Sequence, residues 1–460
     1  MTLLPVPSAR RSAILRRCRP LPRALALVVV WVLAACSGAS PAQPGSDAAL
    51  DAQSLPDAAD AAVENDGGGY TCGDPGSLPR VPLGVFAVGD TRTGIALGLC
   101  TLNEGSFAAP LGSTLELEIT PTGASGVTVA IAYPDDPSFD APLVEVTAAA
   151  TGVPETIPFT PPRSGEFVFL VRSVVPEHAQ WYDLALRCTS GCDLETTRFP
   201  ILLVHGWTGF DNIGPFDYFY QVPGALQAQG YPVEVAALDP YNSVEVRGGQ
   251  LAGVVDDVLA SQRARRINLI AHSQGGLDSR YLISSLGYGD RVSALTTIAT
   301  PHQGTPIADA ALGLLPEVTE DVLSPLLNFL GAVAAGSESD AQASFVSLSE
   351  DHVQNVFNPA NPDDPRVSYI SWTGRTCLYG MSCGDVCDIE IRWAYDILYV
   401  ISGDNDGMVP VSSASWGDYR GEVPADHFDE VGQLLGVTND NFNHLEFYLE
   451  RAGDLTEEGH

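Results

Sequence analysis

Two patterns of apolar and polar positions divide the chain. In the first, apolar residues alternate with polar ones in short runs that clusters of Pro, Gly and Asp separate; these runs cover residues 115–119, 127–131, 167–171 and 182–186. Alternation with a period of two is typical of half-buried strands. Because the runs are short and regularly spaced, we expect a small all-β sandwich over residues 72–195.

The second pattern begins after Glu195. Residues 201–204 and 267–271 are continuous apolar runs, as expected for strands buried on both faces, whereas residues 250–263 show the period of an amphipathic helix. Alternation of strands and helices over residues 196–460 predicts an α/β domain with a mostly parallel, doubly wound sheet.

The N-terminus has the composition of an export signal. Residues 1–23 are rich in Arg, residues 24–33 are apolar, and Ala34-Ala35-Cys36 follows. This layout predicts a signal peptide over residues 1–35. The end of the run resembles the lipobox of bacterial lipoproteins, which implies lipidation at Cys36; the alternative is an ordinary cleaved signal that contains a Cys. Ser37 after the cysteine favours a lipid-anchored protein at the outer membrane or cell surface, and secretion is the alternative location. Residues 36–71 are predicted to form a flexible linker.

Charge and cysteine usage narrow the function further. The formal net charge is −34, all 23 basic residues are Arg, and six of them precede residue 24. A basic groove for nucleic acid is therefore excluded. Outside the cytoplasm the seven cysteines from Cys72 onward should be mostly disulfide-bonded, with one thiol left over. A metal cluster at residues 377–387 is the alternative, although the cysteine spacing is not that of a zinc site.

The decisive segment covers residues 267–276. A buried strand leads into Ala271-His272-Ser273-Gln274-Gly275, and sequence compatible with a helix follows. This is the context of a nucleophile elbow, in which a sharp turn exposes a serine and requires small neighbours. Ala271 replaces the usual first Gly. A chance match to this short motif is the alternative, and the strand-turn-helix setting argues against it.

A nucleophilic serine needs a histidine base and a carboxylate that orients the base. In an α/β-hydrolase these follow the serine in the order acid, then histidine. Asp406 lies in a tight turn after a strand-like run at residues 394–402, and His427 follows about twenty residues later.

The domain resembles the secreted bacterial triacylglycerol lipases of the calcium-dependent class over nearly all of residues 198–450. The matching stretches are residues 199–209, 267–276, 300–305, 405–407 and 427–437. The resemblance implies an α/β-hydrolase fold with Ser273 as nucleophile, Asp406 as acid and His427 as base. Asp404 and His444 are competitors for the last two roles; the Asn-Asp-Gly turn favours Asp406, and the residues after His427 favour His427.

Two backbone amides should stabilise the oxyanion, one after the nucleophile and one after the first core strand. These positions are Gln274 and Trp207. For Trp207 simple packing in the acyl pocket is the alternative, and both roles are compatible. His205 is expected to brace this loop, and His302 to be structural.

The resemblance also implies a structural Ca²⁺ ion. In the family two Asp carboxylates and two carbonyls clamp the loop of the catalytic histidine; Asp429 and the carbonyls of Gln433 and Val437 match by position. The second carboxylate is assigned to Asp388, with Asp385 as the alternative. All-oxygen ligation suits a hard cation. Surface acids of a very acidic protein are the other interpretation.

An apolar lid is expected around residues 307–345. Within it Leu323, Leu326, Leu327 and Leu330 have helical spacing, which also fits an ordinary core-facing helix. The sequence therefore predicts a lipid esterase that works at an oil-water or membrane surface. Alternatives are a short-chain carboxylesterase, a polyester depolymerase, or a non-catalytic surface binding lipoprotein. Related lipases often need a dedicated folding chaperone, which is a further expected partner.

Overall fold

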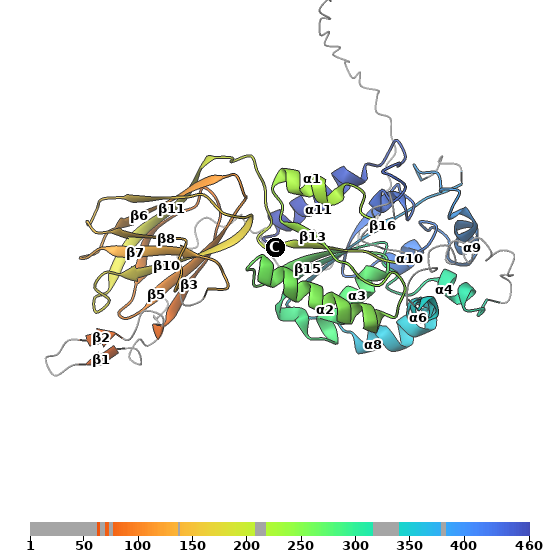
Figure 1. Ribbon diagram of the computed structural model, residues 1–460, viewed down its shortest axis with the longest axis horizontal. Helices are drawn as coiled ribbons and strands as arrows, with labels where there is room; N and C mark the ends of the chain where they lie inside the picture. Colours follow the sequence, from red (N-terminus) through yellow and green to blue (C-terminus); the bar gives the residue numbers. More distant parts are fainter. Residues whose placement is uncertain are drawn as a thin grey trace, which may run out of the picture. The chain divides into compact units, whose positions relative to one another are not determined.

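The computed structural model describes residues 62–64, 70–72, 77–136, 139–207, 218–315, 340–378 and 383–460. Strands make up the regular structure before residue 191, and strands and helices alternate after residue 200 (Figure 1). The predicted signal peptide with Cys36 lies outside the described residues, and so do residues 316–339 of the predicted lid. Within the described ranges no helix is long and apolar enough to cross a membrane.

Two sheets form the first region. Their strand orders are β3-β5-β10-β7-β8 and β4-β11-β6-β9. The bounds are β3 Arg80–Phe86, β4 Thr91–Leu97, β5 Leu102–Ala109, β6 Thr114–Pro121, β7 Val127–Ala132, β8 Val144–Ala148, β9 Glu155–Phe159, β10 Gly165–Ser173 and β11 Gln180–Ser190. The four predicted alternating runs are confirmed as parts of β6, β7, β10 and β11.

Alternation explains how the two sheets share one core. Along β6, Leu115, Leu117 and Ile119 are buried, and the residues between them are half-buried. These side chains belong to the same apolar cluster as Phe167 and Phe169 of β10, in the other sheet. The two sheets therefore pack face to face. Two further strands, β1 (Ala62–Glu64) and β2 (Tyr70–Cys72), pair where the sequence predicted a flexible linker, which corrects that expectation at its C-terminal end.

Six of the seven cysteines from Cys72 onward form disulfides, and Cys387 is buried as a free thiol. The pairs are Cys72–Cys100, Cys188–Cys192 and Cys377–Cys383. The expectation of mostly paired cysteines with one left over is confirmed. The alternative of a metal cluster at residues 377–387 is wrong, because a disulfide joins two of its three cysteines.

The second region is built on a six-stranded sheet in the order β13-β12-β14-β15-β16-β17, and every neighbouring pair is parallel. The bounds are β12 Ile201–Val204, β13 Val233–Val235, β14 Ile267–His272, β15 Val292–Ile298, β16 Ser368–Gly374 and β17 Asp418–Val423. Because all six strands run the same way, their carboxyl ends meet at one edge of the sheet, where ligands bind in open α/β sheets.

Helices cover both faces of this sheet (Figure 1). In β12, Ile201 and Leu203 pack with α1 (Val222–Gln229) and α11 (His444–Glu457). The alternate residues, Leu202 and Val204, pack on the other face with α2 (Val244–Ser261) and α3 (Gln274–Ser284). Within the described ranges the remaining helices are α4 Pro306–Ala311, α6 Ala341–Leu348, α7 Glu350–His352, α8 Asn358–Ala360, α9 Arg392–Ser402 and α10 Val411–Ala414, with short turns of other helix types at Tyr288–Asp290, Val353–Phe357 and Asp429–Val431.

The strand-like run predicted at residues 394–402 is wrong, because these residues belong to helix α9. Ala394, Tyr395 and Leu398 are buried, whereas Tyr399 and Val400 face outward. Burial at positions i, i+1 and i+4 is the helical period, and the aromatic and β-branched composition of the run concealed it.

Candidate active site

Ser273 lies in a strained turn at the carboxyl end of the central strand β14. Its backbone angles are φ 56° and ψ −132°, a conformation that costs energy for a residue other than glycine. The small neighbours make the turn possible. An ideal Cβ at Gly275 would lie 2.6 Å from the carbonyl oxygen of Val204, and one at Gly276 would lie 2.1 Å from the hydroxyl of Thr300. Gly275 and Gly276 are therefore required because β12 and the loop after β15 approach them closely.

The loop after β12 lies directly against this turn. An ideal Cβ at Gly206 would lie 2.4 Å from the Cβ of Ser273, so only a glycine fits. The next residue, Trp207, is buried, and its ring packs against Tyr241 and Phe345 at centroid distances of 5.4 and 4.8 Å. Gln274 is the first residue of α3, where the amide has no intrahelical partner. Both predicted oxyanion positions thus flank Ser273.

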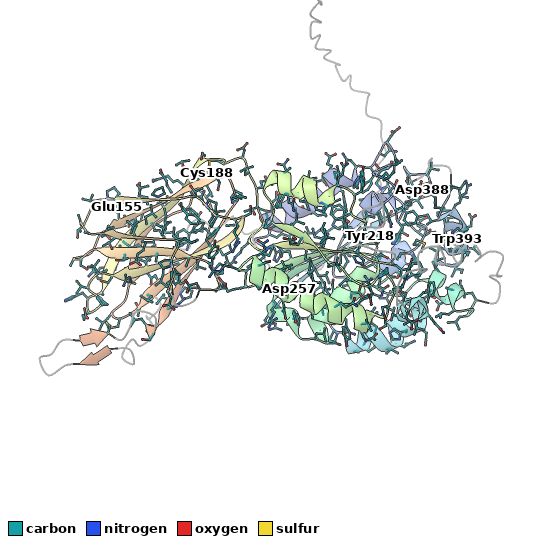
Figure 2. The ribbon with its side chains drawn as sticks, viewed as in Figure 1. Glu155, Cys188, Tyr218, Asp257, Asp388 and Trp393 are labelled. Atoms are coloured by element: carbon teal, nitrogen blue, oxygen red, sulfur yellow. A yellow bond between two sulfur atoms is a disulfide. The ribbon has the colours of Figure 1, made fainter. Side chains whose placement is uncertain are left out.

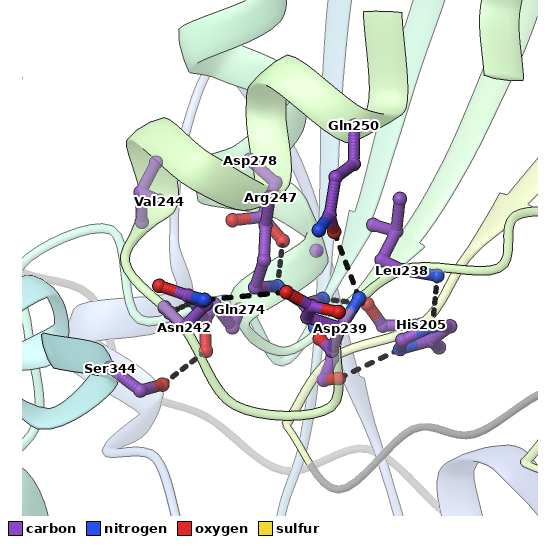
Figure 3. Close-up of polar contacts among 12 residues, drawn as sticks. His205, Leu238, Asp239, Asn242, Val244, Arg247, Gln250, Gln274, Asp278 and Ser344 are labelled. Atoms are coloured by element: carbon purple, nitrogen blue, oxygen red, sulfur yellow. Dashed lines mark hydrogen bonds and ion pairs between the residues drawn. The ribbon is translucent and has the colours of Figure 1, made fainter. Parts of the chain in front are cut away.

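A buried arginine that the sequence did not reveal braces this loop (Figure 3). Arg247 of α2 donates to the carbonyl oxygen of His205 at 2.7 Å and to Asp278 at 2.7 Å, and it also bonds the carbonyl oxygen of Asp239. His205 accepts from the amide of Leu238 at 3.1 Å, and burial lowers its pKa to about 3. Neutral His205 therefore holds the loop by hydrogen bonds.

His427 and Asp406 form a buried pair. Nδ1 of His427 lies 2.8 Å from a carboxylate oxygen of Asp406, and the other oxygen accepts from the amides of Met408 and Val409 at 2.7 and 2.6 Å. These bonds hold the carboxylate in a fixed position and commit Nδ1 of His427 to it. Nε2 is left for the cavity that Ser273 and His427 both line.

The competing residues lie elsewhere. The carboxylate of Asp404 is 3.5 Å from Arg375. Nε2 of His444 lies 3.0 Å from the carbonyl oxygen of Tyr220, and His444 is absent from the lining of the cavity. His302 is buried beside Thr297 and stacks on Trp416, as expected of a structural residue.

A second buried carboxylate, Glu430, also faces His427, and sequence reasoning missed it. One of its oxygens lies 3.8 Å from Nδ1 of His427 and 2.7 Å from Nε2 of His272. The other ring nitrogen of His272 contacts the hydroxyl of Tyr218 at 2.6 Å. Burial, then the charge of Asp406, raises the pKa of Glu430, and burial, then His427, lowers that of His272. Burial thus disfavours the charged form of both residues, and this pair packs beside the Asp406–His427 pair.

The cavity at this edge of the sheet is mainly apolar. Its wall takes Ile307 and Ala308 from α4, Phe345 and Leu348 from α6, and Trp393 from α9. Ile307, Ala308 and Phe345 of the predicted lid thus line the cavity, and residues 316–339 are outside the described residues. An apolar wall around a serine and a histidine suits an acyl chain.

Three carboxylates gather beside the histidine loop. Atoms of Asp388, Asp426 and Asp429 lie within 4.8 Å of one another. Burial, followed by the neighbouring acids, raises the pKa of Asp429 to about 7 and that of Asp388 to about 6, and it raises the pKa of Asp426 strongly. Asp385, the alternative ligand, instead accepts a hydrogen bond from Asn439 at 2.9 Å. The donor set fits a hard divalent cation, which would relieve the repulsion.

Asp426 joins two loops, a role that the sequence analysis did not predict. One of its oxygens accepts from the amide of Asp388 at 2.7 Å. The other accepts from the amides of Phe428 and Asp429 at 3.0 Å each. The two further positions from the resemblance follow on the same loop; Gln433 lines the cavity and Val437 is exposed.

A parallel sheet with a serine in a strained strand-helix turn, and a histidine-aspartate pair on the same cavity, defines a serine hydrolase of the α/β-hydrolase fold. Comparison with curated proteins specifies the class further. The chain is 32% identical to a triacylglycerol lipase of Vibrio cholerae over 278 residues, 56% of this chain and 87% of that protein. It is 30% identical to one of Pseudomonas fragi over 58% of this chain and 99% of that protein.

This chain belongs to the triacylglycerol lipase family, and it is an ester-hydrolysing lipase. A triacylglycerol lipase of Pseudarthrobacter phenanthrenivorans is 36% identical over 53% of this chain and 92% of that protein. Among solved structures, a Bacillus licheniformis lipase in mature form has a TM-score of 0.41 at 20% identity and covers 51% of this chain and 87% of its own. No protein-family model matches the chain.

Proposed function

We propose that this lipase cleaves long-chain triacylglycerols through an acyl-serine intermediate. The observation that supports this proposal is the mainly apolar cavity onto which Ser273 and His427 both open, with Nδ1 of His427 held by Asp406. An apolar wall binds the acyl chain of the substrate, and the polar atoms are concentrated where the ester carbonyl would lie.

The chemistry follows the usual two steps of acyl transfer. Ser273 Oγ attacks the ester carbonyl carbon while Nε2 of His427 accepts the hydroxyl proton, and Asp406 stabilises the imidazolium. The amides of Trp207 and Gln274 donate to the oxyanion. His427 then returns the proton to the leaving alcohol, the acyl-serine remains, and a water activated by His427 releases the fatty acid.

A Ca²⁺ ion is part of this proposal. Asp388, Asp429 and the carbonyls of Gln433 and Val437 would hold it, and Asp426 is a third carboxylate within reach. When bound, the ion supplies charge neutralisation and a fixed loop. The residues of this chain would then keep His427 in place relative to Asp406 and Ser273.

The substrate class is tested by hydrolysis of an ester series from soluble acetate to emulsified trioleate. We expect activity on the long-chain emulsion; activity confined to soluble short esters would indicate the alternative carboxylesterase, and activity on a polyester film the depolymerase. Ser273→Ala should abolish both activity and labelling by a fluorophosphonate, with Ser284→Ala, at the far end of the helix that follows Ser273, as the control. Unlabelled wild-type protein would instead indicate the binding lipoprotein.

Location and folding complete the proposal. We infer export through residues 1–35, lipidation at Cys36, and display at the outer membrane or cell surface or release from the cell, with residues 72–195 as an accessory β domain. A labelled fatty acid should be incorporated into the wild-type protein and not into the Cys36→Ser variant. Refolding of the mature chain without any helper protein tests the dedicated chaperone, because full recovery of activity would remove the need for one.

A further inference from the structure

Met408 is the one methionine among the described residues, because Met1 and Met381 lie outside the described ranges. Its half-buried side chain lines the cavity onto which Ser273 and His427 open. A thioether packs like an apolar group, yet its sulfur is readily oxidised to a polar sulfoxide. Met408 therefore places a sulfur that oxidants can modify in the wall of the substrate cavity.

The backbone of Met408 is fixed to the turn that carries the triad acid. Its amide donates to a carboxylate oxygen of Asp406 at 2.7 Å, and its carbonyl oxygen accepts from the hydroxyl of Thr305 at 2.7 Å. Gly407, the residue before it, has φ 95°, and an ideal Cβ there would lie 2.7 Å from Cδ1 of Ile391. The turn has little room to move, so a change in the side chain of Met408 must alter the cavity wall or disturb the hold on Asp406.

The surroundings of Met408 suit a thioether and not a sulfoxide. Its side chain packs against two apolar clusters, one that includes Ile391 and Tyr395 and another that includes Leu398. Trp393 (Figure 2) lines the same cavity, but its indole nitrogen already donates to a backbone carbonyl oxygen at 2.9 Å. A sulfoxide oxygen is a strong acceptor, and burying such an oxygen without a donor is unfavourable. Oxidation would therefore disrupt the packing of this wall.

The other sulfur atoms of the described residues are protected from an oxidant in the cavity. Six of the seven cysteines from Cys72 onward are already joined in disulfides. The remaining thiol, Cys387, is 5% exposed and does not line the cavity. A buried structural thiol reacts slowly with oxidants. Among the described residues, Met408 is thus the sulfur most accessible to an oxidant that enters the cavity.

We propose that the sulfur of Met408 is a modification site for hydrogen peroxide, and that its oxidation to the sulfoxide lowers the activity of the enzyme. A sulfur lone pair attacks one peroxide oxygen, the O–O bond breaks and an S–O bond forms; the hydroxide released takes the proton of the transferred oxygen and leaves as water. Sulfur is oxidised and peroxide is reduced. This inference concerns regulation of the proposed active site and rests on the proposed function.

The test treats the purified protein with hydrogen peroxide, removes the excess with catalase, and then measures kcat/KM and the masses of the peptides. We expect kcat/KM of the wild type to fall about tenfold, in proportion to the gain of one oxygen by the Met408 peptide. Met408→Leu has a similar volume and no oxidisable sulfur, so it should keep most of its own untreated activity. Met381→Leu is the matched control, which retains Met408 and should lose activity as the wild type does.

The choice of substrate separates this inference from the proposed function. The substrate is a soluble butyrate ester, which a lipase and a short-chain carboxylesterase both cleave. Equal losses in Met408→Leu and the wild type would overturn the inference. Full activity of wild-type protein that carries the sulfoxide at Met408 would also overturn it, and so would a Met408 that stays unoxidised while Met381 gains oxygen. An untreated wild type that cleaves butyrate and not trioleate, with the peroxide response still confined to Met408, would contradict only the proposed function.

Discussion

The serine side and the histidine side of the cavity are held in place in different ways. Ser273 is fixed by its own neighbours in the chain, because β14 ends there and α3 begins at the next residue. His427 lies on a loop, and distant residues hold it. Asp406, whose carboxylate contacts the ring of His427, is 21 positions earlier in the chain. The residue before His427, Asp426, accepts a hydrogen bond from the amide of Asp388, which is 38 positions before Asp426.

This difference teaches where the enzyme is vulnerable. The nucleophile depends on backbone close packing, which changes only when a side chain is inserted. The base depends on carboxylates whose charge responds to pH and to cations. Changes in pH or in cation concentration should therefore affect mainly the placement of His427. Substitution of small residues should affect mainly the placement of Ser273.

The largest effect is expected when the two candidate histidines are each replaced by alanine. His427→Ala removes the base, and we expect kcat to fall about 10⁴-fold or more, because loss of a triad member leaves only the oxyanion hole and binding. His444→Ala is the control; it loses a bond to the carbonyl oxygen of Tyr220 and should keep kcat within about tenfold. Steady-state kinetics on a soluble ester measures both. A fully active His427→Ala would move the base elsewhere.

The next effect separates the two carboxylates that face His427. Asp406→Asn should lower kcat by about 10³- to 10⁴-fold, because the amide no longer holds the imidazole tautomer or stabilises the imidazolium. Glu430→Gln keeps its volume and a polar contact with His272, and burial, which raises the pKa of Glu430, already disfavours its charged form. We expect less than a tenfold loss there. Equal losses would mean that Glu430 shares the orienting role.

The same comparison explains how far the sequence could predict the site. The serine turn was readable because strand, turn and small neighbours are consecutive, so local pattern determines them. The roles of Arg247, Asp426 and Glu430 could not be predicted, because each depends on at least one distant partner. Asp278 is 31 positions from Arg247, Asp388 is 38 from Asp426, and His272 is 158 from Glu430.

Helix α9 shows a different limit of sequence reading. Many of its residues are aromatic and β-branched, as in a strand, and its outer side mixes the charged Arg392 and Asp396 with the exposed Val400. A polar outer face is what normally reveals helical periodicity in a sequence.

On the serine side, Gly206→Ala should be the most damaging small change. Its Cβ would lie 2.4 Å from that of Ser273, so the oxyanion loop or the serine must shift. Since each oxyanion donor contributes on the order of a hundred-fold in rate, we expect kcat to fall by about that factor while KM changes less. Gly249→Ala on α2 is the control, because a Cβ there meets open space. An active Gly206→Ala enzyme would show that the loop is not fixed against the serine.

The smallest effect, and the one that tests the histidine side in solution, is the pH dependence of stability with and without calcium. In the presence of a calcium chelator the pKa of Asp429 is raised to about 7 and that of Asp388 to about 6. The folded state therefore binds protons that the unfolded state has already released above pH 4. This contribution is present at pH 4 and is lost as the pH rises through 7. The Tm of the protein in chelator should therefore fall by several degrees between pH 5 and 8, because about two units of stabilisation are lost at Asp429 and one at Asp388, at most about 4 kcal/mol in total. Ca²⁺ binds the ionised carboxylates and should remove or reverse the fall. Asp429→Asn should abolish the calcium response, and a chelated protein whose Tm rises with pH would argue against a carboxylate cluster at this loop.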